Sequence, residues 1–209
     1  MFGLDYSWLL DPVYQRWLLR GIVTTLELAA LSSAVAVIAG FLGALVLSLR
    51  IWWIDAVLEP FVELFRNPPP LLQMLFFYFT LTQLGFRVED PVTGLTVPLF
   101  SAFACAAISL SLFGAALCIE VFRSGLEAVP KATREAARSL GYGRWKLFAN
   151  VELPIATRIA LPSLANVLTN LFKTTSQASV IAVPELMYYA GQIYNCLLYT
   201  SDAADDTPC

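Results

Sequence analysis

The sequence predicts an all-α membrane protein. Of its 209 residues, 58% are hydrophobic and only 14% are charged, whereas about a quarter of the residues in a soluble domain carry charge. A soluble fold of this length would need more charged residues to cover its surface. Several long uncharged segments interrupted by one basic interval support the same class, with helices crossing a bilayer.

Four segments are predicted to span the membrane, since about 20 apolar residues cross the hydrocarbon core as a helix. The first is uncharged from Leu28 to Leu49, and the last is interrupted only by Lys173. The second is short and begins at the triple proline that ends at Pro70. The predicted spans cover residues 24–49, 70–86, 97–120 and 159–184.

A short amphipathic helix is predicted between the first two spans. Asp55, Glu59, Glu63 and Arg66 recur at intervals that place them on one helical face. This helix is expected to lie on the membrane surface with a kink at Pro60. We interpret its charges as a solvated face, and a docking role is the alternative.

The distribution of basic residues predicts the orientation, because Lys and Arg concentrate on the cytoplasmic side of membrane proteins. The interval 123–158 holds seven of them, whereas the loop between the second and third spans holds only Arg87. The interval is therefore expected in the cytoplasm and the N-terminus outside. Arg16 and Arg20 weakly oppose this orientation.

Composition argues against several other classes. The chain has no histidine, which removes the commonest metal ligand and general base, and its four cysteines lack metal-ligand spacing. No phosphate-binding GxxxxGK[ST] motif is present. Acidic and basic residues balance over 1–195, which argues against nucleic-acid binding. We therefore expect no catalytic residue, metal or cofactor.

The last residues, 196–209, do not continue any preceding pattern. From Cys196 onward they can be encoded by DNA resembling the mosaic end and adapter of a transposase-based sequencing library. We interpret them as a non-native tail and exclude them from the predicted membrane domain, residues 1–195. A natural acidic C-terminus is the alternative.

The charged interval itself predicts two short helices outside the membrane. Pro130 can occupy the first position of a helix, and Gly141 can end it. Gly143 permits a turn, after which a second short helix is expected to stop near Pro154. Two short helices at an angle form a knob that fits a groove in a partner, although the basic face alone would also suit a membrane surface.

A polar stripe is predicted within the fourth span. Asn166, Asn170, Lys173 and Gln177 fall on one helical face. A lone Lys in a membrane helix costs about 2.5–3.5 kcal/mol on insertion scales and usually faces a partner or an aqueous path. We interpret the stripe as a substrate path. The alternatives are that Lys173 pairs with Glu120 or reaches the interface by snorkelling.

Several motifs carry a resemblance to a known family. Glu135-Ala136-Ala137, three residues, Gly141, nine residues and then Val151-Glu152-Leu153-Pro154 resembles the EAA loop of ABC importer permeases, written EAA, three, G, nine, I-x-L-P. FRNPPPLLQ resembles that family's FRxTPLLxQ, and EVFRSGLEAVPKATREAA resembles E-I-x-R-x-G-(I/L)-x-x-(V/I)-P-x-G-Q-x-E-A-A of its polar amino-acid branch. KTTSQASVIAVPEL is similar to K-D-T-S-L-x-S-x-I-x-x-x-E-L, with Thr174 in the Asp position. The similarity covers residues 20–195.

The resemblance implies a type I ABC importer permease fold in the bacterial inner membrane. It implies five spans, of which this chain carries four because the cut at Asn195 removes the last. The implied partners are a second permease subunit, identical or different, cytoplasmic ATPase subunits that hydrolyse ATP, an external substrate-binding protein and the bilayer. The chain itself would be a transport subunit and no enzyme.

The same resemblance implies the site residues. The EAA loop would couple to the ATPase through Arg134, Glu135, Ala136, Ala137, Leu140, Gly141, Arg144, Leu153 and Pro154. An amino acid would be bound along Asn166, Asn170, Lys173, Thr174, Ser176 and Gln177. Lys173 would meet its carboxylate, and Thr174 in place of an acid weakens an assignment to cationic amino acids.

Two other classes stay open at this point. A secondary transporter or channel would work without an ATPase, but it predicts internal repeats and leaves the charged interval without a role. A membrane scaffold would use that interval to recruit a soluble protein without transport.

Overall fold

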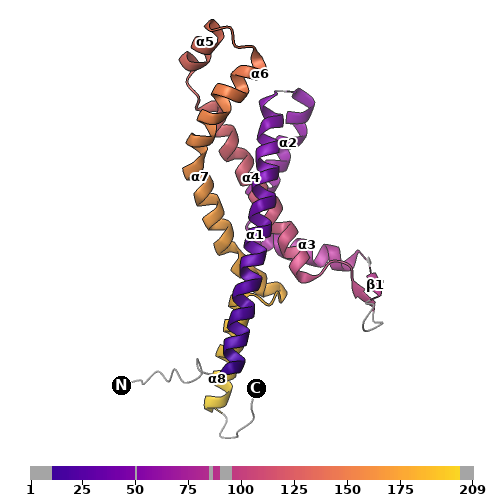
Figure 1. The fold of residues 1–209 in the computed structure, drawn as a ribbon. Coiled ribbons are helices and arrows are strands. Elements are labelled where there is room, and N and C mark those ends of the chain that lie inside the picture. The colour runs from indigo at the N-terminus through magenta and orange to yellow at the C-terminus, as the bar shows by residue number, and fades with distance from the viewer. Residues whose placement is uncertain (1–10, 50, 85–86, 90–95, 203–209) are drawn as a thin grey trace.

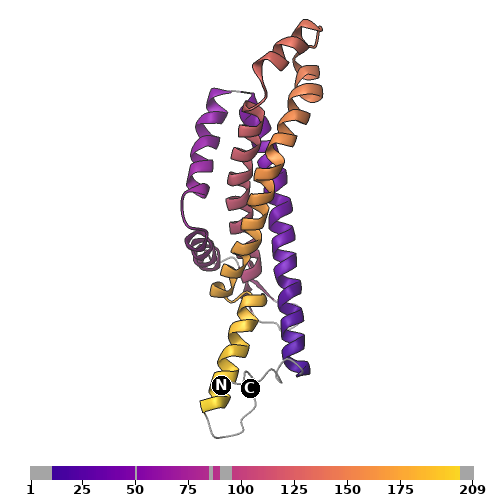
Figure 2. The ribbon, with the colours of Figure 1, turned by 90° about the vertical axis from the view of Figure 1, so that its left-hand side faces the viewer.

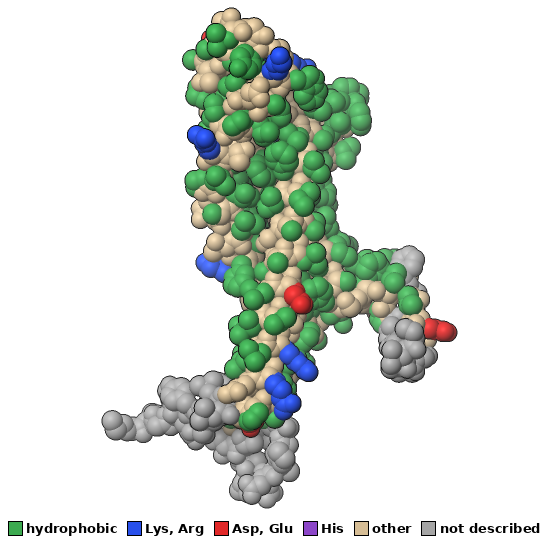
Figure 3. Space-filling model, viewed as in Figure 1, with side chains coloured by type: hydrophobic (Ala, Val, Ile, Leu, Met, Phe, Trp, Pro, Cys, Tyr) green, Lys and Arg blue, Asp and Glu red, His purple; other side chains and the backbone are tan. Residues whose placement is uncertain are grey.

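The computed structural model describes residues 11–49, 51–84, 87–89 and 96–202, and these are mostly helical (Figure 1). Three long helices run side by side: α1 (Pro12–Ser48), α4 (Ala102–Glu127) and α7 (Leu153–Thr174). Within the described ranges, three helical stretches are long and apolar enough to cross a membrane, 12–48, 102–127 and 144–181. Hydrophobic side chains cover most of the shaft that they form (Figure 3).

Helix α4 lies at the centre and packs closely on α1. A Cβ added at Gly40 of α1 would lie 2.2 Å from the Cβ of Cys118, and one added at Gly114 of α4 would lie 2.7 Å from the Cβ of Ala36. Small residues allow this approach. Within lipid no hydrophobic contrast drives helices together, so close packing must hold α1 on α4.

Helix α1 begins earlier than the predicted first span, at Pro12 and not near residue 24. The Asp11 carboxylate accepts a hydrogen bond from the Val13 amide at 2.8 Å, and Pro12 occupies the first turn. This cap starts the helix outside the uncharged segment, because a capped first turn tolerates polar residues that the hydrocarbon core does not.

The second predicted span, residues 70–86, differs in length and direction. Helix α2 (Trp52–Arg66) ends before the prolines, and α3 (Pro70–Gln83) then runs across the axis of α1, so that Figure 2 shows it end-on. Its 14 residues extend about 21 Å at 1.5 Å per residue, less than the roughly 30 Å of a hydrocarbon core. Because the prolines prevent a continuous helix, the chain turns here.

The turn between α2 and α3 is closed by one side chain. The buried Gln73 amide nitrogen donates to the carbonyls of Phe65 at 2.8 Å and Pro68 at 3.0 Å. The prolines interrupt the backbone here, so these two carbonyls lose the amide donors that a continuous helix would supply. Buried carbonyls need another hydrogen-bond donor, and the Gln73 amide supplies it.

The charged face of α2 is only partly solvated. Arg66 pairs with Glu120 of α4 at 3.3 Å, and Glu59 pairs with Arg123 of α4 at 3.4 Å. Each side chain in these pairs is more than a third exposed, so each pair contributes about 0–1 kcal/mol. Two of the four residues that the sequence placed on a solvated face therefore tie α2 to α4.

A β-hairpin precedes α4 where the sequence predicted the start of the third span near residue 97. Strand β1 (Arg87–Glu89) pairs antiparallel with β2 (Thr96–Pro98). Helix α4 begins only at Ala102, where the Ser101 hydroxyl accepts from the Ala104 amide at 3.1 Å. The cap, together with strand pairing of the preceding residues, moves the helix start along the chain.

Pro154 does not end the second short helix, contrary to the prediction. Helix α6 (Arg144–Leu147) passes through a π-helical turn, η2 (Phe148–Glu152), directly into α7. The Leu153 amide bonds to the Phe148 carbonyl, five residues back. Such π-helical segments occur mostly as single turns inside α-helices. Here the turn lies just before the proline, whose ring would otherwise press on the carbonyl four residues earlier.

The fourth predicted span, 159–184, is broken after Thr174. A 3-10 helix, η3 (Thr175–Ile181), follows, and Ala182 has a left-handed φ of 60°. Helix α8 (Leu186–Asp202) then packs against the N-terminal half of α1. The first residues of the predicted foreign tail, 196–202, lie within α8, and 203–209 lie outside the described residues. The origin of that tail stays a prediction.

Substitution of Gly40 by Ala should destabilise the fold. An added methyl forces α1 and α4 apart, and overpacking costs about 1–3 kcal/mol, more than the roughly 1 kcal/mol that Ala gains over Gly in a helix. Gly191→Ala in α8 is the matched control, since nothing lies within 4 Å of its Cβ position. Thermal unfolding in detergent should show a lower midpoint for Gly40→Ala alone. Equal midpoints for the two variants would contradict the close α1–α4 contact.

Candidate functional site

The charged interval forms a knob at one end of the molecule, made of α5 (Lys131–Ser139) and α6 (Figure 1). Pro130 lies just before α5 at its N-cap. Gly141 ends α5 with a left-handed φ of 82°. The Tyr142 amide donates to the Ala137 carbonyl at 3.2 Å and the Gly141 amide to the Arg138 carbonyl at 2.9 Å. This is the glycine-closed helix end that the spacing predicted.

The tip of this knob exposes apolar side chains to solvent. Leu140 is 78% exposed and Trp145 is 77% exposed, with Tyr142 between them. Ala137 and Leu147 instead turn inward and are buried. Large apolar side chains exposed this close together in the sequence indicate a surface that another protein covers.

The predicted coupling residues divide between this outer surface and the body. Glu135, Ala136, Leu140, Gly141, Arg144 and Pro154 are exposed, whereas Ala137 is buried and Leu153 and Arg134 are half-buried.

Arg134 is engaged within its own chain. Its Nη2 donates to the Leu126 carbonyl at 2.6 Å, and its Nε lies 2.9 Å from Oε1 of Glu152. The Nε–H does not point at that carboxylate, so the second contact is an ion pair without an aligned hydrogen bond. Glu152 is a residue that the sequence reasoning missed, since no local spacing links it to Arg134.

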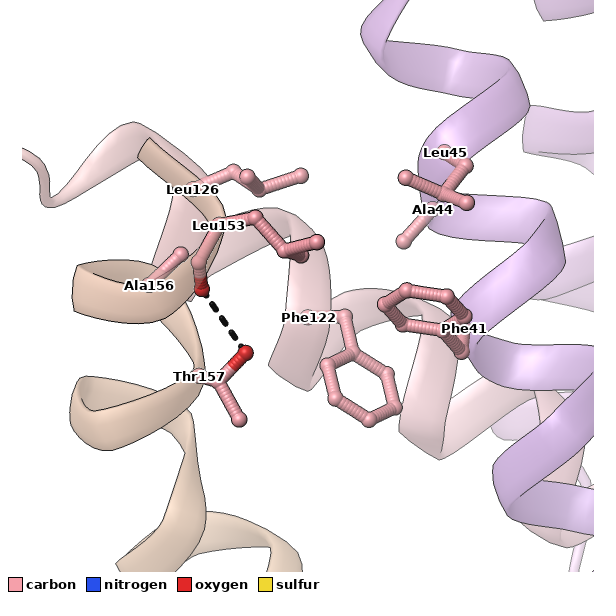
Figure 4. A pocket seen from close by; sticks show the side chains of 8 residues that line it. All are labelled: Phe41, Ala44, Leu45, Phe122, Leu126, Leu153, Ala156 and Thr157. Carbon is pink, nitrogen blue, oxygen red and sulfur yellow. Dashed lines mark hydrogen bonds between the residues drawn. The ribbon is translucent and has the colours of Figure 1, made fainter. Parts of the chain in front are cut away.

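An apolar crevice lies beneath the knob, where α7 separates from α1 (Figure 4). Its only side-chain polar group, the Thr157 hydroxyl, is used by its own helix through a 2.8 Å bond to the Leu153 carbonyl. None of the predicted path residues lines it, so the crevice is no candidate for binding an amino acid. It is lined by Phe41, Ala44 and Leu45 of α1, Phe122 and Leu126 of α4, and Leu153, Ala156 and Thr157 of α7.

The predicted polar stripe lies on the outer face of α7. Asn166, Asn170 and Lys173 are exposed, as is Ser176 at the start of η3. Thr174 is buried and bonds to the Asn170 carbonyl at 2.8 Å, so it leaves the stripe. The alternative pairing of Lys173 with Glu120 is not found among the described residues, where Glu120 pairs with Arg66.

Gln177 sits at the inner edge of this stripe. It is half-buried, and its carbonyl Oε1 is enclosed without a hydrogen-bond partner. An enclosed acceptor of this kind is costly unless a further group satisfies it.

A buried carboxylate, Glu185, matches the Glu of a quoted family motif, but the sequence reasoning gave it no role. It is 1% exposed, and its Oε1 accepts from the Tyr188 amide at 2.8 Å, capping α8. Thr25 of α1 donates to the Gly21 carbonyl at 2.8 Å and accepts from the Leu186 amide at 3.1 Å. The sequence signal was the Glu of the motif K-D-T-S-L-x-S-x-I-x-x-x-E-L, which does not indicate burial. The bond between the Leu186 amide and Thr25 fastens the start of α8 to α1.

Comparison with known proteins now decides the family. A model of the family described as "Binding-protein-dependent transport system inner membrane component" matches residues 21–201. The chain belongs to this family. It is a permease subunit of an ABC importer, and membership places it in the inner membrane as a transport component and not an enzyme.

Relatives in the amino-acid branch support this assignment. The permease is 36% identical over 177 residues to the octopine transport system permease protein OccM of Rhizobium radiobacter, covering 84% of this chain and 71% of the relative. It is 31% identical to the arginine ABC transporter permease protein ArtM of Haemophilus influenzae, covering 87% of this chain and 78% of that protein. The predicted branch is therefore confirmed, and the secondary-transporter and scaffold alternatives are not favoured.

Solved structures confirm the predicted fold class. An amino acid ABC transporter crystallised with histidines superposes with a TM-score of 0.80 at 28% identity, covering 94% of this chain and 86% of that chain. The MetNI methionine transporter superposes with a TM-score of 0.68 at 17% identity, and this likeness shows the fold alone. As a family member, the permease works with ATPase subunits, a permease partner and a substrate-binding protein.

Proposed function

We propose that this permease imports an amino acid and that its α5–α6 knob docks an ATPase subunit. The observation that carries the coupling role is the pair of exposed apolar side chains, Leu140 and Trp145, on either side of the left-handed Gly141 in the sequence. Burying such side chains on a partner is favourable at about 25 cal/mol per Å² of apolar surface. Exposed Glu135 and Arg144 would add charge complementarity at the rim.

The polar stripe of α7 supports a role in the translocation path. Asn166, Asn170 and Lys173 face outward from this subunit, and lipid cannot satisfy them. They therefore require either water or a second permease subunit on that face. A path between two subunits supplies both, and Lys173 would meet the carboxylate of an amino acid there.

The amino-acid class of substrate rests on the relatives. Their names specify octopine, arginine and glutamine, which share an α-carboxylate on an amino-acid backbone. We propose recognition of the shared carboxylate by Lys173, with Ser176 and Gln177 of η3 at the same level of the path.

We further propose that the knob faces the cytoplasm and the N-terminus faces outward. The charged interval, residues 123–158, contains the knob and holds seven Lys and Arg. These residue types concentrate on the cytoplasmic side of membrane proteins. The opposite end carries an aromatic cluster, in which Trp17 of α1 stacks on Tyr189 of α8 at 6.0 Å between ring centroids. Such residues gather at membrane interfaces.

Gly141→Val should abolish ATPase docking while membrane insertion stays normal. The β-branched residue cannot easily adopt a φ of 82°, and the left-handed conformation costs about 1–2 kcal/mol for residues with a Cβ. The segment from Leu140 to Trp145 then no longer keeps the conformation that docking requires. Co-purification of the ATPase with the full transporter and uptake of labelled amino acid are the measurements.

Gly143→Val is the matched control for this loss. Gly143 also has nothing within 4 Å of its Cβ position, but its φ of −67° is ordinary for any residue. It should retain docking and uptake. Retained docking by Gly141→Val would refute the coupling role.

Lys173→Met should reduce uptake by about tenfold or more, which corresponds to about 1.4 kcal/mol, without loss of assembly. The lost interaction is the one to the substrate carboxylate, so the half-saturating substrate concentration should rise in proteoliposomes. Lys131→Met on the knob removes the same charge and is the control. Wild-type uptake kinetics in Lys173→Met would contradict the proposed path.

A cysteine placed at exposed Ser139 should test the orientation. A membrane-impermeant maleimide should label it in inside-out vesicles and not in intact cells. Labelling of intact cells would reverse the proposed topology.

A further inference from the structure

We propose that Arg134 is a positioning residue that fixes the angle between the knob and α7. This inference rests on the proposed coupling role of the knob. It assigns Arg134 to the transmission of force inside the permease and not to contact with the ATPase.

The geometry of Arg134 joins three segments. Its guanidinium reaches the Leu126 carbonyl in the last turn of α4 at 2.6 Å and the Glu152 carboxylate in η2 at 2.9 Å, while its backbone belongs to α5. The guanidinium thus donates one directed hydrogen bond, to the Leu126 carbonyl, and its charge attracts the Glu152 carboxylate beside it. A cation is also favoured at the C-terminal end of α4, where carbonyls lack helical partners.

The ion pair between Arg134 and Glu152 is more buried than the ion pairs between α2 and α4. The side chains of Arg134 and Glu152 are 28% and 19% exposed, whereas each partner in the α2–α4 pairs is at least 37% exposed. Less water competes for the pair, so its electrostatic attraction is stronger.

Few other contacts hold α5 in place. It has 9 residues, and Ala137 is its one buried residue. An isolated helix of this length is marginal in water, so tertiary contacts must determine its position. Arg134 supplies such a contact, and its partner Glu152 lies immediately before α7, where the backbone changes from π-helical to α-helical bonding.

The pair occupies positions that the family motifs leave open. Arg134 is the x in Q-x-E-A-A, and Glu152 is the x in I-x-L-P. Of the motif residues between them, Glu135, Ala136 and Gly141 are exposed and Ala137 is buried. The docking surface and the brace are thus separate sets of residues, since Leu140 and Trp145 follow the end of α5, whereas Arg134 and Glu152 join α5 to η2.

A double-mutant cycle in the full transporter tests this inference. Arg134→Met, Glu152→Gln and the double variant should each retain the bound ATPase but lose at least fivefold in amino acid transported per ATP hydrolysed. The double variant should be no worse than Arg134→Met, because both changes remove the same contact. Arg134→Lys keeps the positive charge but lacks the guanidinium group. Its amino acid transported per ATP hydrolysed should lie between the values for wild type and Arg134→Met.

Arg138→Met is the matched control, since Arg138 lies one turn further along α5, is exposed and makes no ion pair within the described ranges. It should retain coupling. Wild-type transport per ATP in both Arg134→Met and Glu152→Gln would overturn the proposal. Loss of the bound ATPase in Arg134→Met with wild-type behaviour in Glu152→Gln would also overturn it, because Arg134 would then contact the ATPase directly.

A distance measurement separates this proposal from the docking proposal. Spin labels on cysteines replacing exposed Ser139 of α5 and Ser163 of α7, in an otherwise cysteine-free chain, report the angle without any ATPase present. The distance distribution should broaden in Arg134→Met and Glu152→Gln and stay narrow in Arg138→Met. Unchanged distributions would refute the brace, whereas retained docking by Gly141→Val would refute the docking surface and leave the brace intact.

Discussion

The contact between α1 and α4 is the packing constraint on which the other elements depend. Gly40 and Gly114 remove the side chains that would separate the two helices, and α4 then offers its remaining faces to α2, α3 and α7. Apolar side chains gain no free energy by leaving lipid, so the attraction between the helices must come from the close approach of their backbones. The distribution of small residues therefore determines which helix occupies the centre. Of the three stretches long and apolar enough to cross a membrane, α4 is the most buried.

Each interruption of a helix is matched by a group that satisfies the backbone. Gln73 bonds the carbonyls left by the prolines between α2 and α3, and the π-helical turn rearranges the bonds before Pro154. Glu185 caps α8 after the left-handed Ala182. Unpaired backbone groups are costly in a bilayer. The two side chains and the π-helical turn supply the missing hydrogen bonds, so the chain can bend at these three places. Two of the three bends adjoin the knob or the polar stripe.

The sequence predicted features whose cause is local and missed those whose cause is a distant contact. Gly141 was predicted to end α5 because a left-handed helix end needs only one glycine, and the exposed stripe followed from spacing along one helix. The direction of α3, the pairing of Arg66 with Glu120 and the burial of Glu185 depend on residues far away in the chain. Pro154 was misjudged because a proline that stops a regular helix can be accommodated by one wider turn.

The proposed docking of an ATPase subunit requires two kinds of residue in the knob. A docking surface must be exposed, and Leu140 and Trp145 are exposed; a surface on a short helix transmits force only if something holds that helix to the membrane body. Ala137 buries little area, so packing alone leaves α5 free to rotate about the glycine-containing connection. The Arg134 contacts with Leu126 and Glu152 restrict that rotation, because they attach α5 to the end of one spanning helix and the start of the next. Movement of the docked partner would then displace α4 and α7 together, and α7 carries the polar stripe.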